Sequence, residues 1–354
     1  MSQSAACFAF ARMGPLFRKL SAVPPAEQWL THGAALSQQL NTATTAASAD
    51  LLQDTVLASR IFHFYLPVFF WCRSIVVEAR KTNPNLAVGI GLSAPQGCGK
   101  TTLVNLLTSC FERDGLVCAA VSFDDFYLTG AEQDILAATH PSNPLLQVRG
   151  NAGTHDIGLG TNTLRSLLRR DSSVIIPRYD KSARNGRGDR GDKSTWTVCK
   201  SADVVLLEGW MAGFAPITLN TLLHGDKEKD EVTKSNTKKE QDNADQEKTG
   251  MREINVFMER YSEWHDQMNS WVVVGIDDIN FVYSWRLQAE HAMKNSGKNG
   301  MTDDQVSDFV SRYMPAYQTY LPALYRDSEN GGVGSKSTLL VKVGSDRQVL
   351  ELGK

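Results

Sequence analysis

The segment 91–102, GLSAPQGCGKTT, constrains this chain more than any other part of its sequence. It follows a short apolar run and precedes a stretch with helical spacing, which is the context of a phosphate-binding P-loop. Small residues let backbone N–H groups surround phosphate oxygens, and the positive end of the following helix points at them. Lys100 can reach the β- and γ-phosphates, and the Thr101 hydroxyl can bind Mg²⁺. We therefore predict a site for ATP and Mg²⁺ formed by Gly97, Cys98, Gly99, Lys100, Thr101 and Thr102.

One position departs from the P-loop pattern G-x-x-x-x-G-K-[ST]. Ala94 stands where the pattern has its first glycine, so the turn cannot use the most glycine-specific torsion angles there. The alternative interpretation is an ordinary Gly-rich turn in which Gly-Lys-Thr-Thr occurs by coincidence. A P-loop also fits kinases, ATPases and GTPases alike, so other residues must decide the reaction.

Apolar runs of strand length alternate with helix-length segments along the chain. This alternation predicts an α/β fold, with a P-loop NTPase-type parallel sheet flanked by helices. We expect a helix over 101–111 after the P-loop and a buried helix over 61–77. The expected strands are 86–92, 117–122, 174–176, 203–207, 271–276 and 339–343.

The composition divides the chain into regions. Residues 1–85 contain Ala-rich and Gln/Leu-rich stretches such as 34–40, which favour helix. We predict a helical N-terminal addition over 1–85 that packs on a P-loop domain over 86–354. The stretch 225–250 holds almost no apolar side chains. We predict a disordered insertion there, because it cannot bury enough surface to offset its chain entropy.

Two expected strands end in acidic residues. Asp124 and Asp125 follow the strand over 117–122, at the edge where open α/β sheets bind ligands. A carboxylate there can accept the proton of an attacking hydroxyl, although an Asp pair can also simply cap a helix. Glu208 ends the apolar strand over 203–207 and is placed to hold Mg²⁺ directly or through water.

Cationic side chains gather in two polar, Gly-rich segments, 149–156 and 177–190. Arg149, Lys181 and Arg187 are our candidates for binding a substrate carboxylate, with a solvated basic loop as the alternative. Arg286 follows the strand over 271–276 and is placed to stabilise the charge of the transferred phosphoryl group. The alternative interpretation is that Arg286 is an ordinary arginine on the surface of a helix.

Charge and hydropathy restrict the possible partners. Lys and Arg number 37 against 39 Asp and Glu, for a net charge of −2, whereas nucleic-acid binders usually carry a basic domain. The longest apolar run, 64–72, is short for a membrane span and contains Pro67. The six scattered cysteines form no metal-binding pattern and suggest reduced thiols. We expect a monomer that binds neither nucleic acid nor membrane.

Several strings together resemble the plant-type D-glycerate 3-kinases, P-loop kinases grouped with uridine kinases, phosphoribulokinases and pantothenate kinases. The strings are SAPQGCGKTTLV, SFDDFYLT, RGNAGTHD, PRYDKSARNGRGDR, LLEGWMAGF, YSWRLQAE and FVSRYMPAYQTYLPALY. The resemblance runs from about residue 8 to the end and implies transfer of phosphate from Mg-ATP to D-glycerate, giving 3-phosphoglycerate. By similarity to the pattern D-x-F-Y, Asp124 aligns with the catalytic base.

These expectations define the site. Lys100, Asp124 and Arg286 are the predicted catalytic residues, and Thr101 and Glu208 the predicted metal ligands. The predicted substrate contacts are Asp125, Tyr127, Arg149, His155, Asp156, Tyr179, Lys181 and Arg187. The alternatives are a kinase for a nucleoside or pantothenate, and a non-catalytic ATP-binding protein. The resemblance begins so near the N-terminus that we expect a cytoplasmic protein, with the chloroplast of plant members as the alternative.

Overall fold

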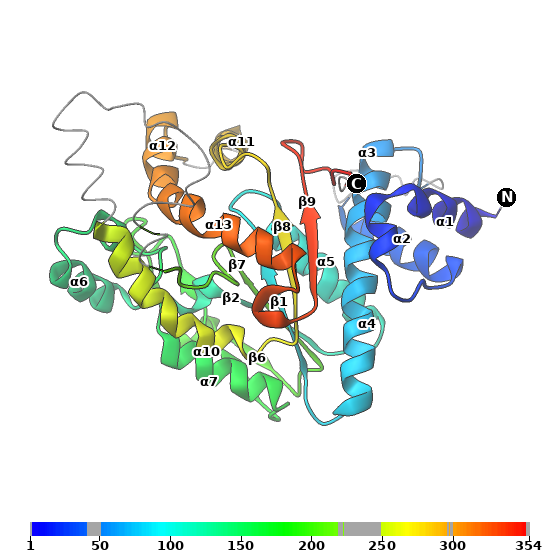
Figure 1. Ribbon diagram of the computed structural model, residues 1–354, viewed down its shortest axis with the longest axis horizontal. Coiled ribbons are helices and arrows are strands. Elements are labelled where there is room, and N and C mark those ends of the chain that lie inside the picture. Colours follow the sequence, from blue (N-terminus) through cyan, green and yellow to red (C-terminus); the bar gives the residue numbers. More distant parts are fainter. Residues whose placement is uncertain are drawn as a thin grey trace.

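A five-stranded parallel sheet forms the centre of the protein. The computed structural model describes residues 2–40, 51–218, 222, 249–295, 297 and 300–351. The strands lie in the order β2 (Cys118–Ser122), β7 (Val204–Gly209), β1 (Val88–Ser93), β8 (Ser270–Gly275) and β9 (Thr338–Lys342) (Figure 1). All four neighbouring pairs are parallel, so every strand ends at the same edge of the sheet. The predicted fold class is confirmed.

Helices cover both faces of this sheet (Figure 1). The α-helices of the P-loop region and beyond are α5 (Lys100–Arg113), α6 (Gly130–Thr139), α7 (Ile157–Leu168), a helix over 249–258, α10 (Ser262–His265), α11 (Phe281–Asn295), α12 (Asp303–Ser311) and α13 (Met314–Glu329). Short 3-10 turns lie at η3 (Phe123–Phe126), η4 (Pro144–Leu146), η5 (Lys193–Thr195), η6 (Glu259–Tyr261) and η7 (Val333–Ser335).

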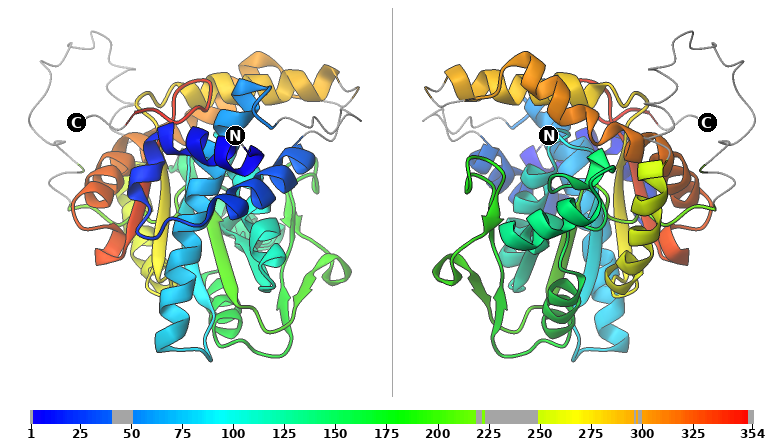
Figure 2. Two further views of the ribbon diagram at one scale, coloured as in Figure 1. Left: turned by 90° about the vertical axis from the view of Figure 1, so that its right-hand side faces the viewer. Right: turned by 90° about the vertical axis from the view of Figure 1, so that its left-hand side faces the viewer.

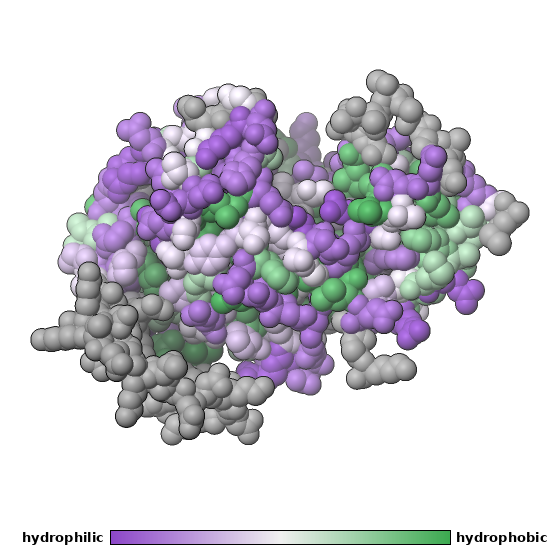
Figure 3. All heavy atoms as spheres, turned by 90° about the horizontal axis from the view of Figure 1, so that it is seen from above, coloured by the Kyte–Doolittle hydropathy of each residue, from purple (hydrophilic) through white to green (hydrophobic). Residues whose placement is uncertain are grey.

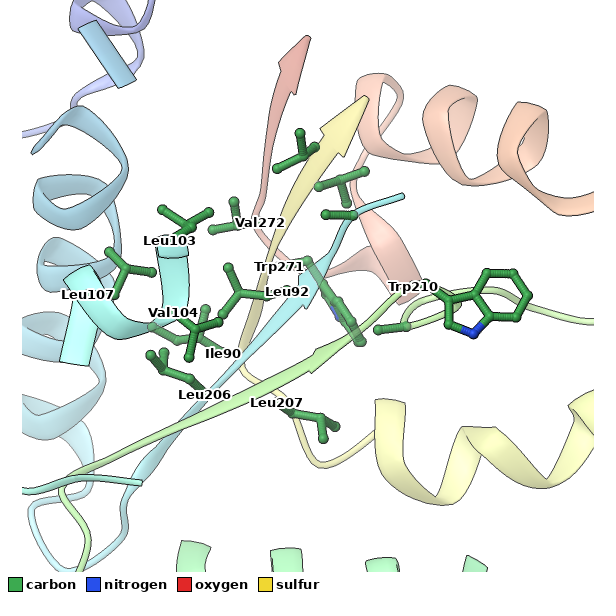
Figure 4. Packing of buried hydrophobic residues seen from close by; sticks show 14 of the residues in the cluster. Ile90, Leu92, Leu103, Val104, Leu107, Leu206, Leu207, Trp210, Trp271 and Val272 are labelled. Atoms are coloured by element: carbon green, nitrogen blue, oxygen red, sulfur yellow. The ribbon is translucent and has the colours of Figure 1, made fainter. Parts of the chain in front are cut away.

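The core is packed from apolar side chains on both faces of the strands. β1 is buried along its whole length, as expected for a central parallel strand. Figure 4 shows side chains of β1, β7 and β8 pointing toward the inner side of α5: Ile90, Leu92, Leu206 and Val272 meet Leu103, Val104 and Leu107. This packing fixes the start of α5, and hence the P-loop, at the end of the central strand.

One expected strand lies outside the parallel sheet. β3 (Val174–Ile176) pairs antiparallel with β6 (Thr197–Cys199), and β4 (Tyr179–Asp180) pairs with β5 (Asp189–Arg190) in a second ribbon. Ile175 is 57% exposed between two buried neighbours, a pattern that suits a one-sided ribbon better than a strand buried on both faces. In the sequence, β3 and β4 precede the basic loop over 181–188, and β5 and β6 follow it.

The N-terminal region is helical and packs on the sheet domain. It contains α1 (Gln3–Met13), η1 (Pro15–Lys19), α2 (Ala26–Leu40), α3 (Thr55–Ser59), the π-helical turn η2 (Arg60–Tyr65) and α4 (Leu66–Thr82). Figure 2 shows α1 and α2 lying across the upper part of α4. Phe69 of α4 meets Phe111 of α5 edge to face, with ring centroids 5.2 Å apart. The boundary at residue 85 stays a prediction. The predicted insertion over 225–250 lies outside the described residues, except for the helical Thr249 and Gly250.

One helical stretch has the length and composition of a membrane span. Thr55–Thr82 has 28 residues and a best-window hydropathy of 1.3, but 67% of that window is buried inside the protein. Core helices of soluble proteins have the same properties, so this stretch is weak evidence for a membrane. Viewed from above, hydrophobic residues gather over the N-terminal helices, whereas much of the remaining surface is hydrophilic (Figure 3).

Candidate active site

The turn between β1 and α5 has the conformation that a phosphate cradle needs. Gly97 and Gly99 have φ angles of +83° and +94°, in the region that favours glycine. A Cβ on Gly97 would lie 2.6 Å from Cβ of Trp285, so a side chain is also excluded there by space. Ala94 is not among the residues with positive φ, and its backbone N–H donates to Gly209 O over 3.3 Å. The departure at Ala94 therefore leaves the turn unstrained.

Lys100 and Glu208 meet beneath this turn. Glu208 lies near the end of β7, between Leu92 of β1 and Ser122 of β2. Its Oε2 lies 3.4 Å from Lys100 Nζ, and both side chains are largely buried. Burial alone would lower the pKa of Lys100, but Glu208 and, more weakly, Asp124 raise it overall. Lys100 is thus held as a cation at the floor of the cradle.

Asp124 faces the same space from the turn after β2. The Ser122 hydroxyl accepts a hydrogen bond from Asp124 N over 3.2 Å and begins the short helix that presents the carboxylate. Asp124 Oδ2 lies 2.5 Å from Lys181 Nζ, and the Asp124 side chain is 30% exposed. Burial would raise the pKa of Asp124, but Lys181, Lys100 and the Tyr127 hydroxyl lower it overall. The carboxylate is therefore ionised and directed at the cradle.

Asp125 supports the turn and does not line the cavity. Its Oδ2 accepts hydrogen bonds from Ser122 N over 2.9 Å and from Arg178 over 2.6 Å. Burial raises the pKa of Asp125 to about 6, against the opposing effect of Arg178. Because both partners are internal, Asp125 is placed to fix the direction of Asp124. It was predicted as a substrate contact, but it is not among the residues that line the cavity.

His155 and Asp156 lie behind Tyr127. The His155 ring stacks on the Tyr127 ring at 4.5 Å and shares a 2.6 Å hydrogen bond with the Tyr261 hydroxyl. Burial lowers the pKa of His155 to about 3, so the ring is neutral. Asp156 caps α7 through Leu159 N and pairs with Arg190 at 3.2 Å. Of these residues only Tyr127 lines the cavity.

The three predicted carboxylate-binding cations have different environments. Lys181 reaches Asp124 and lines the cavity. Arg149 also lines it, but its guanidinium donates to the carbonyls of Gly186, Arg187 and Lys181 and lies over the Tyr179 ring. Arg187 pairs with Asp134 at 2.8 Å outside the cavity, and Tyr179 is also absent from the lining. Lys181 therefore has the most direct access to a substrate anion.

Arg286 approaches from α11. It pairs with the buried carboxylate of Glu290, and its guanidinium lies 5.0 Å from the centre of the Phe309 ring. Arg286 Nε is buried and has no hydrogen-bond partner among the described residues. Glu290 also accepts a hydrogen bond from Met301 N over 2.9 Å, which joins α11 to the segment before α12. Arg286 is thus held in the wall of the cavity that Asp124 also lines.

One cavity of about 850 Å³ collects these groups. Its lining includes the predicted residues Gly97, Lys100, Thr101, Asp124, Tyr127, Arg149, Lys181, Glu208 and Arg286. It also includes residues that we did not predict, among them Gln96, Ser182, Trp210, Glu290, Gln305, Phe309 and Tyr313. Trp210 directly follows Glu208 and Gly209 in sequence, so its place after a ligand-binding strand was a usable signal. Phe309 of α12 and Tyr313, which precedes α13, lie within the string FVSRYMPAYQTYLPALY of the family resemblance, but they follow no strand that would place them at the site.

Comparisons with known proteins agree with this geometry. No family model matches the chain. It is 39% identical over 339 residues to "D-glycerate 3-kinase, chloroplastic" of Arabidopsis thaliana, covering 92% of this chain and 68% of that protein. It is 35% identical to "Probable ATP-dependent kinase TDA10" of Saccharomyces cerevisiae, covering 77% of this chain and 90% of that protein.

A solved structure is similar as well. The D-glycerate 3-kinase of Cryptococcus neoformans superimposes with a TM-score of 0.66 at 31% identity, over 80% of this chain and 97% of that one. The resemblance found in the sequence strings is thereby confirmed over most of the chain. On the identity, the coverage and the shared fold, this chain belongs to the D-glycerate 3-kinase family.

Proposed function

We propose that this protein transfers the γ-phosphate of ATP to the 3-hydroxyl of D-glycerate, giving 3-phosphoglycerate and ADP. The observation that carries the proposal is that Lys100, Asp124 and Lys181 line one cavity, with Lys181 bound to Asp124 at 2.5 Å. A phosphate-binding lysine, a carboxylate and a cation for a substrate anion are the groups that this reaction needs. The names of the family members supply the substrate.

The residues divide the reaction between them. The cradle over 97–102 binds the β- and γ-phosphates, and Lys100 neutralises charge on them. Lys181 binds the carboxylate of D-glycerate. Asp124 orients the hydroxyl and accepts its proton as oxygen attacks the γ-phosphorus in line and the bond to ADP breaks. Arg286 stabilises the charge on the transferred phosphoryl group.

Mg²⁺ fits the residues beside the cradle. Apart from its 3.4 Å ion pair with Lys100, the buried Glu208 Oε2 has no hydrogen bond among the described residues, and the Thr101 side chain is exposed at the start of α5. A hydroxyl, one carboxylate and substrate phosphates are the usual protein environment of Mg²⁺. When bound, the ion offsets negative charge on the phosphates. Thr101 and Glu208 are the residues that we propose would hold it.

The direct test is ADP release by the purified protein with Mg-ATP and one of four acceptors: D-glycerate, L-glycerate, uridine or pantothenate. We expect turnover with D-glycerate, and NMR of the product locates the phosphate. The Asp124→Asn variant should lose about 10²- to 10⁴-fold in kcat, since it loses a general base. Asp171→Asn, which changes an exposed carboxylate in the loop after α7, is the matched control.

Other outcomes distinguish the alternatives. Turnover with uridine or pantothenate would keep the kinase mechanism and replace the acceptor. ATP binding without turnover of any acceptor would favour a non-catalytic ATP-binding protein. Near-normal activity of a folded Asp124→Asn variant would remove Asp124 as the base.

We further propose that the protein works as a monomer in the cytoplasm, without nucleic acid or membrane partners. None of the six cysteines, which all lie in the described part of the chain, forms a disulfide, and this suits a reducing compartment. Light scattering after size-exclusion chromatography gives the oligomeric state. Imaging of a C-terminal fluorescent fusion separates a cytoplasmic protein from a chloroplast one.

A further inference from the structure

The basic loop over 181–188 forms part of the wall of the active-site cavity but has little packing of its own. Lys181, Ser182 and Gly186 line the cavity, and most side chains of the loop are exposed. Arg184 and Asn185 have φ angles of +53° and +57°, which residues with a Cβ rarely adopt. The loop therefore needs contacts from other parts of the protein to keep this conformation.

Arg149 holds the loop from the body of the protein. Its Nη1 donates to the carbonyl oxygens of Gly186, over 2.9 Å, and of Arg187. Its Nη2 lies 3.4 Å from the carbonyl oxygen of Lys181. One side chain therefore reaches both the beginning and the end of the loop.

The backbone beside Arg149 is itself fixed. The next residue, Gly150, is buried, and its N–H donates to Thr154 Oγ1 over 3.0 Å. The carbonyl oxygen of Gly150 accepts a hydrogen bond from Trp210 Nε1 over 3.2 Å. Trp210 directly follows β7, the strand that carries Glu208. Arg149 thus connects the loop to the edge of the sheet at which the proposed chemistry occurs.

Two residues pack around the Arg149 guanidinium. It lies 5.6 Å from the centre of the Tyr179 ring. A Cβ on Gly188, which has a φ of +82°, would lie 2.5 Å from that ring and 2.8 Å from Arg149 Nη1. A larger residue at 188 would have to displace the loop or the guanidinium. This close packing fixes the position of the loop relative to Arg149.

A second anchor holds the outer side of the loop. Arg184 and Arg187 both pair with Asp134 of α6, Arg187 at 2.8 Å. These side chains are partly exposed, and such ion pairs usually contribute little to stability. Neither pair involves Lys181, at the beginning of the loop. The inner anchor, Arg149, is therefore the contact that restrains the backbone of Lys181.

We propose that Arg149 is a positioning residue that acts through Lys181. By holding the loop, it keeps the Lys181 ammonium where the acceptor carboxylate binds, and it forms no ion pair with the acceptor itself. Both N–H groups of Nη1 and one of Nη2 are directed at loop carbonyls. The end of the guanidinium is then not free to bind a carboxylate through two parallel hydrogen bonds. The inference rests on the proposed function for the acceptor, but the loop contacts do not.

The first test is kinetic and uses the full chain with Mg-ATP. Arg149→Met should raise KM for D-glycerate about tenfold, the same scale as loss of the Lys181 contact, and should change kcat and KM for ATP less than about twofold. Arg169→Met, at an exposed arginine directly after α7, is the matched control and should alter none of these values. A normal KM for ATP shows that Arg149→Met is folded. An unchanged KM for D-glycerate in that folded variant would overturn the inference.

Combining Arg149→Met with Lys181→Met separates action through Lys181 from direct contact with the acceptor. If Arg149 acts through Lys181, the double variant should have the KM of Lys181→Met to within about twofold, because the second change removes nothing further. Two independent contacts would instead multiply, and KM would rise about a hundredfold. That result would identify Arg149 as an acceptor ligand and overturn the inference.

Limited cleavage by trypsin observes the loop without any acceptor. Mass spectrometry locates cuts after Lys181, Arg184 and Arg187, and these should form about tenfold faster in Arg149→Met than in the wild type or Arg169→Met. Equal rates would overturn the inference.

Arg149→Lys is a second variant, in case Arg149→Met loses affinity for ATP. It keeps the charge but not the planar group that reaches three carbonyls, so KM for D-glycerate and loop cleavage should rise together. A wild-type KM with a rapidly cut loop would overturn the inference. If the wild type does not phosphorylate D-glycerate but Arg149→Met opens the loop, the proposed function fails and the anchoring role of Arg149 stands.

Discussion

Lys181 occupies a position that makes it a determinant of substrate choice. Its ammonium lies 2.5 Å from the carboxylate that we propose as the base, although the lysine side chain is 59% exposed. The acceptor hydroxyl can donate its proton to Asp124 without competition only when Lys181 binds another anion. An acceptor that carries its own carboxylate supplies that anion, whereas a neutral acceptor leaves the pair intact.

The Lys181→Met variant tests this coupling. We expect KM for D-glycerate to rise about tenfold, the scale of one partly exposed ion pair that gains from a fixed geometry. The ratio of kcat/KM for glycerol to kcat/KM for D-glycerate should rise as well, because Asp124 is no longer paired. Lys193→Met, at an exposed lysine of η5, should leave both values unchanged. An unchanged acceptor ratio in Lys181→Met would contradict the coupling.

At the level of residues, the sequence located site residues that belong to a local motif better than site residues whose partners are distant in the sequence. Lys100, Thr101 and Glu208 were predicted from local context, and they meet in the structure. Asp125 and Arg187 have the same chemistry as Asp124 and Lys181, yet their ion-pair partners are Arg178 and Asp134. Those partners lie about 50 residues away in sequence, so no local pattern indicates which charges are left for a substrate.

Among the elements, the central strands were the most predictable. Their continuous apolar runs follow from burial on both faces, whereas the small ribbons of β3 to β6 depend on long-range pairing. The helical N-terminal region was predicted from composition, but its close approach to the turn η2 was not. A Cβ on Gly33 of α2 would lie 2.6 Å from the Phe62 ring, so a glycine is needed at this contact.

The Gly33→Ala substitution measures that contact. In a helix, Gly→Ala usually raises the free energy of unfolding by up to about 1 kcal/mol. At residue 33 we expect it to fall by about 1–3 kcal/mol, because Phe62 must move within a packed core. Gly158→Ala in α7, where the nearest atom is 3.7 Å away, should show the usual gain. Urea unfolding compares the two variants, and equal gains would show that the contact between α2 and η2 is loose.

For the molecule as a whole, two buried histidines couple folding to pH. Burial lowers the pKa of both His155 and His265 to about 3. His265 Nε2 accepts a hydrogen bond from Gly213 N over 3.1 Å, which requires a neutral ring. Both histidines bind a proton in the unfolded chain below about pH 6.5 but not in the folded one. Their contribution to stability is therefore complete above pH 6.5 and is lost as the pH falls toward 3.

The His155→Phe variant isolates one of these contributions. Between pH 6 and pH 4.5, each such histidine makes the free energy of unfolding fall by about 1.4 kcal/mol per pH unit. The variant cannot take up that proton. The slope of its free energy of unfolding against pH should therefore be smaller than that of the wild type by about 1.4 kcal/mol per pH unit. Gly33→Ala removes no titratable group and should keep the wild-type slope at lower stability. Urea unfolding at several pH values gives the slopes. If wild type and His155→Phe have equal slopes, His155 is protonated within the folded protein, and the ring behind Tyr127 carries a charge beside the proposed base.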